Sequence, residues 1–391
     1  MKSRSDDIWE SYPGNKLSTL ALPDYYSNYI AYTFDASQHP HTGLRITGYF
    51  PDARYMSVNI YATKQGTSLN ALTDYQIMTP TPGGNPFVAG SRAAPGEQRQ
   101  YVLHVQPEAG EKRGKKKQAP EPENLLTFDP GGLKDGELTV IIRYYVPQPD
   151  ECGGVKLPTV EGYDVRDPAK PRLRPKPIPG RMLVHEPLFC KRMEPIFDAA
   201  GRRELRFYHV AGGGQFNNAD NMYLISAVKG VDGRENVVVL KVRPPSYPTY
   251  SGEFDSATVR YWSFNQGDPD TSTPFGQRDA EFRAAKDGFV YVVMGDESFR
   301  DAAERGGYNY MPWRANRQQA VILYRNMLTV PQYRNSIARV PRLPPSGDWD
   351  KKVLVEYDAS RYIGDSAPSG RKVTAAEFFE SYGGMPSPGF P

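Results

Sequence analysis

One strand-like pattern occurs twice in this chain, and the repeat limits the folds that it can adopt. The segments DARYMSVNIY (52–61) and TVRYWSFNQG (258–267) share the pattern Arg-Tyr-x-Ser-x-Asn. Side chains along a strand alternate between its two faces, so Met56, Val58 and Ile60 fall on one face. The tyrosine, serine and asparagine positions fall on the other face in both segments. Each segment is therefore predicted to be a half-buried strand.

Four further pairs of similar blocks surround these two strands in the same order. They are 27–34 with 221–228, 43–48 with 238–243, 100–105 with 288–294, and 138–150 with 319–333. The last pair closes on Val-Pro-Gln in both copies. A shared order over five blocks predicts two copies of one β-rich module.

Composition and length agree with a β-rich chain of two modules. The chain has 391 residues, with 36 glycines and 36 prolines, which favours short strands and many turns. We predict an all-β fold with minor α content: two tandem antiparallel β-sandwich or jelly-roll-like modules related by internal duplication. The predicted parts are a first module (1–150) with a charged loop (107–124), a Pro-rich basic linker (151–181), a second module (182–345), and a C-terminal extension (346–391) with a short helix at 374–382.

Charge and hydropathy exclude several classes of protein. The net charge of +3 is small for this length, so no global field favours nucleic acid. No run of 18 apolar residues and no signal-peptide pattern occur, which predicts a cytoplasmic protein without a membrane partner. Cys152 and Cys190 are the only cysteines, and neither they nor the five histidines have ligand spacing. We therefore expect no metal and no cofactor.

The repeated Tyr-x-Ser-x-Asn face has two interpretations that the sequence leaves open. It can satisfy backbone groups and cross-strand pairs within each sheet, or it can form the polar floor of a ligand cleft. Arg54 and Arg260 precede the two strands on the apolar side, where an arginine more often meets a buried carboxylate than a substrate.

Candidate site residues gather in the second copy, whose loops are richer in aromatic residues. His209 precedes three glycines, which let a backbone approach a ligand closely. The predicted acid and base candidates are His209, Tyr261 and Glu186. The predicted substrate-binding residues are Ser263, Asn265, Tyr308, Tyr310 and Trp313.

The doubled strand and the Val-Pro-Gln closures resemble a group of bacterial double-β-sandwich proteins, mostly of unknown function. Within that group the chain is similar to proteins of the crocagin pathway, in which a ribosomally made peptide becomes a fused pyrroloindoline. The resemblance implies a biosynthetic protein that helps to cyclise a Tyr/Trp-containing core peptide through positioning and acid–base help. Its expected partners are a precursor peptide or an aromatic small molecule and other pathway enzymes, with a homodimer as one option.

The alternative is a non-catalytic double β-sandwich that binds a peptide or a carbohydrate, or that assembles with another enzyme. The same aromatic content supports it, and so does the lack of a nucleophile elbow, zincin helix or dinucleotide fingerprint in the sequence.

The charged loop generates a first testable prediction. Residues 107–124 offer too little apolar surface to offset the entropy of ordering, so limited proteolysis should cut there first. Mass spectrometry of the fragments checks this, and cutting within 167–181 while the loop resists would contradict it.

Overall fold

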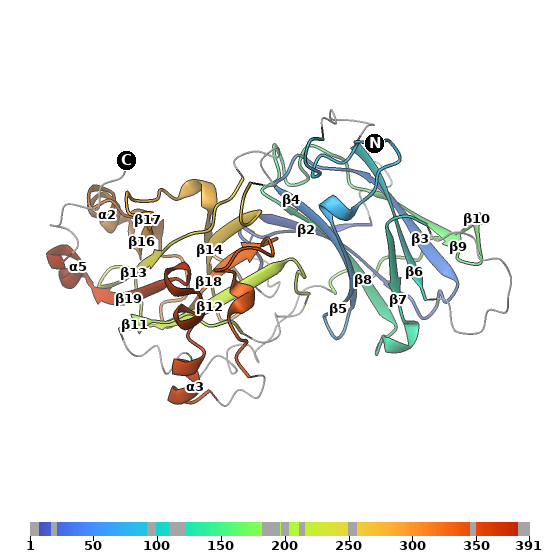
Figure 1. Cartoon of the computed structure of the whole chain (residues 1–391). Coiled ribbons are helices and arrows are strands. Elements are labelled where there is room, and N and C mark those ends of the chain that lie inside the picture. The colour runs from blue at the N-terminus through green and yellow to red at the C-terminus, as the bar shows by residue number, and fades with distance from the viewer. Residues whose placement is uncertain are drawn as a thin grey trace.

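The computed structural model describes residues 8–16, 22–91, 99–108, 122–181, 196, 203–210, 216–248, 256–344 and 349–381. Within them the chain forms four β-sheets, two in each half, and the halves lie side by side (Figure 1).

The first half contains two five-stranded sheets, A and B. In spatial order, sheet A consists of β1 (Glu10–Pro13), β2 (Ser27–Asp35), β8 (Glu137–Tyr145), β4 (Tyr55–Ala62) and β5 (Thr67–Thr73). Sheet B consists, in the same sense, of β10 (Asp167–Arg172), β9 (Thr159–Asp164), β3 (Thr42–Tyr49), β6 (Gln100–Pro107) and β7 (Leu125–Phe128).

The second half contains sheets C and D. In spatial order, sheet C consists of β11 (Glu204–Leu205), β19 (Ser369–Thr374), β13 (Asn236–Val242), β16 (Val290–Gly295) and β17 (Asn309–Pro312). Sheet D consists of β12 (Asn221–Lys229), β18 (Gln319–Met327), β14 (Tyr261–Gly267) and β15 (Phe275–Arg278).

The two halves have the same topology. The order β2-β8-β4-β5 in sheet A matches β12-β18-β14-β15 in sheet D, and β9-β3-β6-β7 matches β19-β13-β16-β17. Even the parallel pair β6/β7 has a counterpart in β16/β17. The register also repeats, because Ser57 lies opposite Arg143 and Ser263 opposite Arg325. The predicted duplicated β-sandwich fold is confirmed.

The module boundaries drawn from the sequence need correction. The predicted linker at 151–181 contains β9 and β10, and β9 pairs with β3 in sheet B. The predicted C-terminal extension supplies β19, which pairs with β13 in sheet C. Each module completes its second sheet with a strand that returns after β8 or β18. β10 is an edge strand, in which prolines are tolerated. Its prolines led to the prediction of a linker for this segment.

Each half has its own apolar core between its two sheets. Met56, Val58 and Ile60 all lie in the first core, on the face that the alternation predicted. In the second core Trp262 stacks on Phe282 with ring centroids 5.0 Å apart. The two cores account for the apolar face of each repeated strand.

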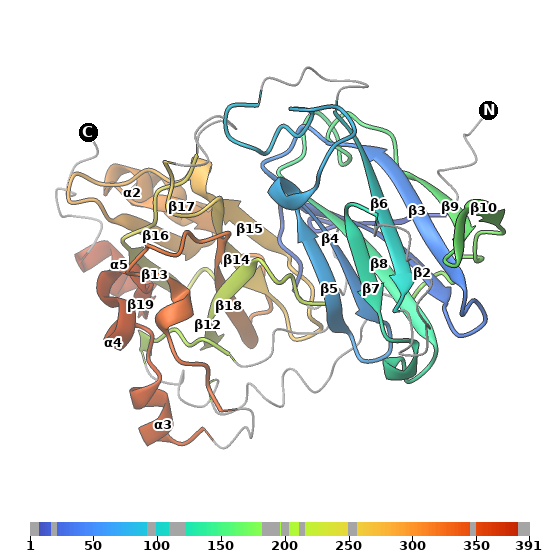
Figure 2. The same ribbon diagram turned by 45° about the vertical axis from the view of Figure 1, so that its right-hand side comes forward.

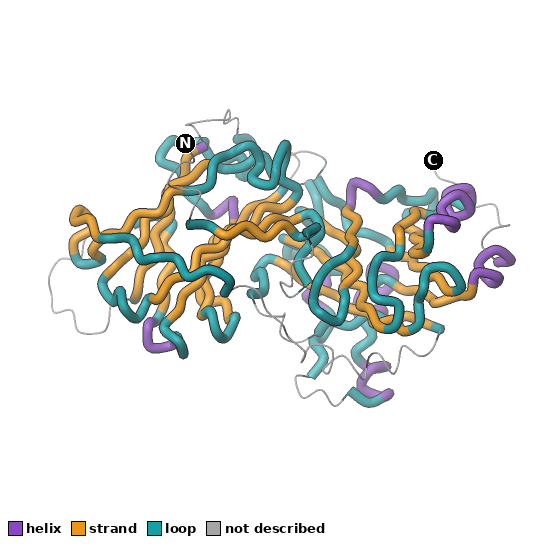
Figure 3. The backbone as a smooth tube through the Cα atoms, turned by 180° about the vertical axis from the view of Figure 1, so that it is seen from behind, coloured by secondary structure: helices purple, strands orange, loops and turns teal. Residues whose placement is uncertain are grey.

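Helices are few and short among the described residues, and most belong to the second half (Figure 3). They are η1 (Asp74–Gln76), η3 (Pro130–Gly132), η5 (Asp279–Glu281), η6 (Glu297–Phe299), α2 (Arg300–Arg305), η7 (Ile337–Arg339), α3 (Lys351–Glu356), α4 (Ser360–Ile363), η8 (Gly364–Ser366) and α5 (Ala375–Ser381). None of these described helices is long and apolar enough to span a membrane. The predicted C-terminal helix is α5, and its capping box is formed, since Glu377 N donates to Thr374 Oγ1 at 3.2 Å.

Residues 109–121 of the charged loop at 107–124 lie outside the described residues. Its expected mobility therefore stays a prediction.

The stacked Trp262 generates a second prediction. Trp262→Ala removes a large, almost fully buried ring, so the free energy of unfolding should fall by about 3–5 kcal/mol. Urea unfolding followed by circular dichroism measures this. Trp262→Phe, which keeps an aromatic ring, is the matched control and should lose less; equal losses would contradict the packing role.

Candidate functional site between the two halves

The polar faces of sheets A and D are turned toward each other. Tyr55, Ser57 and Asn59 are fully buried, and so are their counterparts on β14. Tyr145 and Tyr261 meet across the boundary with ring centroids 5.5 Å apart. The repeated strands are therefore buried on both faces, which corrects the prediction of half-buried strands. The reason is that each half covers the polar face of the other.

The segments that precede β2 and β12 are exchanged between the halves. Residues 22–26 lie on sheet D and residues 216–220 lie on sheet A; we call them the exchanged arms. Leu22 N donates to Thr271 O at 2.7 Å, and Phe216 N donates to Gly66 O at 2.9 Å. Both arms turn at a left-handed residue, with φ of 60° at Leu22 and 58° at Phe216. The exchange thus follows an approximate two-fold relationship between the halves.

Two ion pairs with fully buried carboxylates obey the same relationship. Arg54 Nη1 lies 2.8 Å from Asp279 Oδ1, and Arg260 Nη1 lies 3.2 Å from Asp74 Oδ2. Each arginine therefore finds its carboxylate in the opposite half. Asp74 also accepts a hydrogen bond from Met56 N at 2.9 Å. The expectation that these arginines meet buried carboxylates is correct, although the sequence did not show that the partners cross between modules.

Three predicted site residues are brought together around Asp24 of the first exchanged arm. Tyr261 OH donates to Asp24 Oδ1 at 2.7 Å, and Ser263 Oγ donates to Oδ2 at 2.8 Å. Asn265 Nδ2 lies 3.3 Å and Arg325 Nε 3.7 Å from the same Oδ2. Burial, followed by the charge of Asp24, raises the pKa of Tyr261 well above its ordinary value, so this phenol stays protonated.

The equivalent place on sheet A has different chemistry, because Asn218 stands where Asp24 stands in the other copy. Tyr55 OH lies 3.1 Å from Asn218 Oδ1 and 2.6 Å from Asp220 Oδ2. The guanidinium of Arg143 donates to Asn59 Oδ1 at 3.1 Å and to Phe216 O at 2.6 Å. In this copy the carboxylate of the arm stands two residues later in the chain, at Asp220, and not at the position that faces Arg143.

The other predicted residues lie elsewhere. His209 is buried, its Nδ1 is 2.9 Å from Val340 O, and burial lowers its pKa. Tyr310 OH donates to Gly295 O at 3.1 Å, beside the half-buried Tyr308. Trp313 belongs to the second core. Glu186 lies outside the described residues. Tyr308 and Tyr310 pack in one apolar cluster, Trp313 in the second core and Tyr261 at the boundary between the halves, so these residues do not form one site.

The residues that sequence reasoning missed are the charged ones at the interface: Asp24, Asp74, Arg143, Asp220, Asp279 and Arg325. One signal for them was present, since each copy places an arginine within its apolar last block, at 143 and 325. An arginine in an apolar strand needs a partner when it is buried, and its occurrence in both copies points to a shared contact.

The interface carboxylates are engaged with arginines or hydroxyls. Within the described part of the chain, no three His, Cys, Asp or Glu side chains gather as a metal-binding group. The carboxylates are therefore not free to bind a cation. The donors of the interface suit an anion better.

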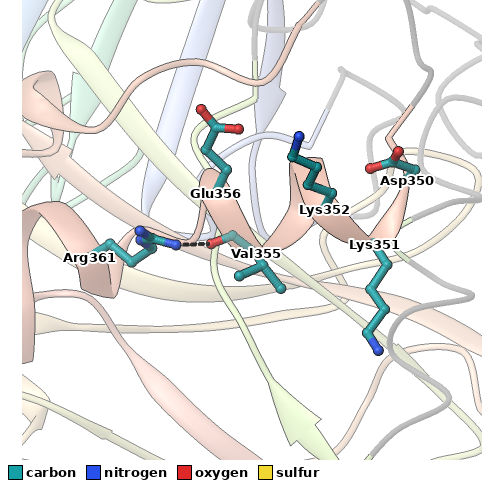
Figure 4. A pocket seen from close by; sticks show the side chains of 6 residues that line it. All are labelled: Asp350, Lys351, Lys352, Val355, Glu356 and Arg361. Atoms are coloured by element: carbon teal, nitrogen blue, oxygen red, sulfur yellow. Dashed lines mark hydrogen bonds between the residues drawn. The ribbon is translucent and has the colours of Figure 1, made fainter.

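A surface depression on the second half is lined by residues of α3 and α4 (Figure 4), of which α3 projects from the body of that half (Figure 2). It is lined by Asp350, Lys351, Lys352, Val355, Glu356 and Arg361. Asp350 is occupied as the N-cap of α3, since its Oδ1 accepts from Val353 N at 2.8 Å. The lining carries three cations and two carboxylates, a net charge of +1.

Comparisons with known proteins give the fold and no more. No protein-family model matches the chain, and no curated protein matches it. An uncharacterized protein from Burkholderia cenocepacia has a similar structure, with a TM-score of 0.54 and 12% identity, over 95% of this chain and 83% of that one. A protein from Vibrio parahaemolyticus gives a TM-score of 0.43 at 11% identity, over 90% of each chain. The chain thus shares its fold with an uncharacterized bacterial protein.

The crossed ion pairs generate a third prediction. Arg260→Met leaves the buried Asp74 carboxylate without its cation, so the free energy of unfolding at pH 7 should fall by about 3–5 kcal/mol. Burial raises the pKa of Asp74 to about 6, against the lowering effect of Arg260. Below pH 6 the folded protein therefore holds a proton on Asp74, and a neutral carboxyl group no longer needs the arginine.

The difference between wild type and Arg260→Met should shrink as the pH falls from 7 to 5. Urea unfolding at both pH values measures it, with the exposed Arg283→Met as a matched control. A loss that does not depend on pH would show that Asp74 keeps its charge and would contradict this account.

Proposed function

We propose that the protein is a non-catalytic binding protein whose partner surface lies on α3 and α4. The observation that carries the proposal is the open depression there, where Lys351, Lys352 and Arg361 surround exposed apolar groups. Val355 is 39% exposed and Tyr362 is 41% exposed. An open surface of mixed apolar and cationic character suits an extended chain better than a small molecule, which usually binds in a deep pocket.

The burial of the repeated polar face supports this choice over peptide cyclisation. Tyr261, Ser263 and Asn265 are fully buried and hydrogen-bonded to Asp24. A role as cleft lining would require these contacts to break and the two halves to separate. We therefore assign these residues to holding the halves together.

The chemistry of the depression defines the class of partner. Three cations and two carboxylates, Asp350 and Glu356, line it, so its net charge is +1. We expect a peptide or protein segment that combines acidic side chains with an aromatic one. The resemblance to crocagin-pathway proteins makes a Tyr-Trp peptide the natural first probe, either as a precursor peptide or as a segment of a pathway enzyme.

Isothermal titration of the full-length protein with an acidic peptide that ends in Tyr-Trp tests the proposal. Lys351→Glu/Arg361→Glu should weaken binding at least about 10-fold, which corresponds to 1.4 kcal/mol. Lys134→Glu/Lys286→Glu reverses two exposed charges elsewhere and is the matched control. Affinity should also fall with added salt, since the lining is exposed.

Three outcomes would overturn the proposal. The wild type does not bind such peptides, both double variants bind equally well, or the peptide loses its indole absorbance during incubation. The last result would instead favour cyclisation, because a pyrroloindoline no longer has an aromatic indole.

A further inference from the structure

The cluster around Arg143 on sheet A contains several hydrogen-bond donors and a charge without a carboxylate. Among the described residues, Asn59 Nδ2, Arg143 Nε and Asn218 Nδ2 have no hydrogen-bond partner, and Ser57 Oγ has only the neighbouring Tyr55 hydroxyl. Arg143 is 1% exposed and Asn59 is fully buried. Asp220 does not compensate Arg143 directly, because its carboxylate engages the hydroxyls of Tyr55 and Thr73.

The internal repeat shows what the four donors are arranged around. In the second copy Asp24 Oδ1 accepts from Tyr261 OH and from Tyr26 N, at 2.7 and 3.0 Å. Asn218 Oδ1 accepts the equivalent bond from Asp220 N at 3.1 Å and lies 3.1 Å from Tyr55 OH, whose hydrogen goes to Asp220 Oδ2 at 2.6 Å. The remaining atom, Asn218 Nδ2, therefore corresponds to Asp24 Oδ2.

That oxygen is the acceptor of the second copy. Asp24 Oδ2 accepts from Ser263 Oγ and Asn265 Nδ2, and Arg325 Nε lies 3.7 Å away as an ion pair without a hydrogen bond. Their counterparts on sheet A are Ser57, Asn59 and Arg143, as the strand register shows. Where one copy has donors around a carboxylate oxygen, the other has the same donors and an amide nitrogen.

Elementary energetics favours an acceptor that carries charge at this place. A buried guanidinium without a counter-charge costs several kcal/mol, and each unsatisfied buried donor adds to that. A water oxygen accepts two hydrogen bonds, which is fewer than the donors present. The orientation of Asn59 is fixed, because its Oδ1 accepts from Tyr61 OH at 2.9 Å and from Arg143. Its Nδ2 therefore cannot be turned into an acceptor.

We propose that the first half binds one small monovalent anion of the chloride class between Ser57, Asn59, Arg143 and Asn218. A single charge matches the single guanidinium. The anion provides the negative charge near Arg143 that the Asp24 carboxylate provides near Arg325 in the second half. This site is separate from the α3–α4 surface and does not depend on the function proposed above.

Thermal unfolding of the full-length protein at constant ionic strength provides the test, with chloride exchanged stepwise for gluconate, which is too large to be buried. Raising chloride from 1 to 100 mM should raise the Tm by about 2–4 °C. The variant Asn218→Asp/Asp220→Asn keeps the net charge and supplies the missing carboxylate, so its Tm should not depend on chloride. Asp220→Asn alone is the matched control and should keep the dependence.

Crystals grown in sodium bromide give a second measurement that does not rely on the variants. An anomalous peak within about 3.5 Å of Asn59 Nδ2 and Arg143 Nε would support the site. A Tm that is independent of chloride, a chloride effect of equal size in the double variant, or the absence of a bromide peak would each overturn the proposal.

Discussion

The exchange of buried charge between the two halves is the interaction on which the rest of the structure depends. Arg54 and Arg260 each project into the opposite half, where Asp279 and Asp74 receive them. A buried charge that loses its partner is costly, so neither half can leave the other without exposing or orphaning these groups. The burial of the polar faces of sheets A and D follows from this, since the neighbouring half covers them and their own core does not.

Duplication explains both the symmetry of this interface and its one clear asymmetry. The arms, the left-handed turns and the ion pairs all occur twice, as expected if two copies of one module once packed as a symmetric pair. The carboxylate of the arm does not repeat, since it stands at position 24 in one copy and at position 220 in the other. This change separates Arg143 from a direct carboxylate partner and gives the first half its distinct chemistry.

The alternation of the repeated strands was enough to predict the duplicated sandwich and the apolar faces. It could not show that the polar faces are buried, because a polar face that meets another polar face looks the same in sequence as one that meets water. The linker was misjudged because β9 and β10 are short and because β10 contains two prolines. The charged interface residues were missed because Asp24 and Asp220 lie outside the repeated strands, where no periodicity marks them.

Native-state hydrogen exchange of β4 and β14, compared between wild type and Arg260→Met, tests the central claim most directly. If the crossed ion pairs join the halves into one cooperative unit, amides of Val58 and Phe264 should open with the same free energy. Arg260→Met should then lower both by the same amount. An opening free energy that falls in β14 alone, with β4 unchanged, would show that the halves unfold independently and would contradict this account.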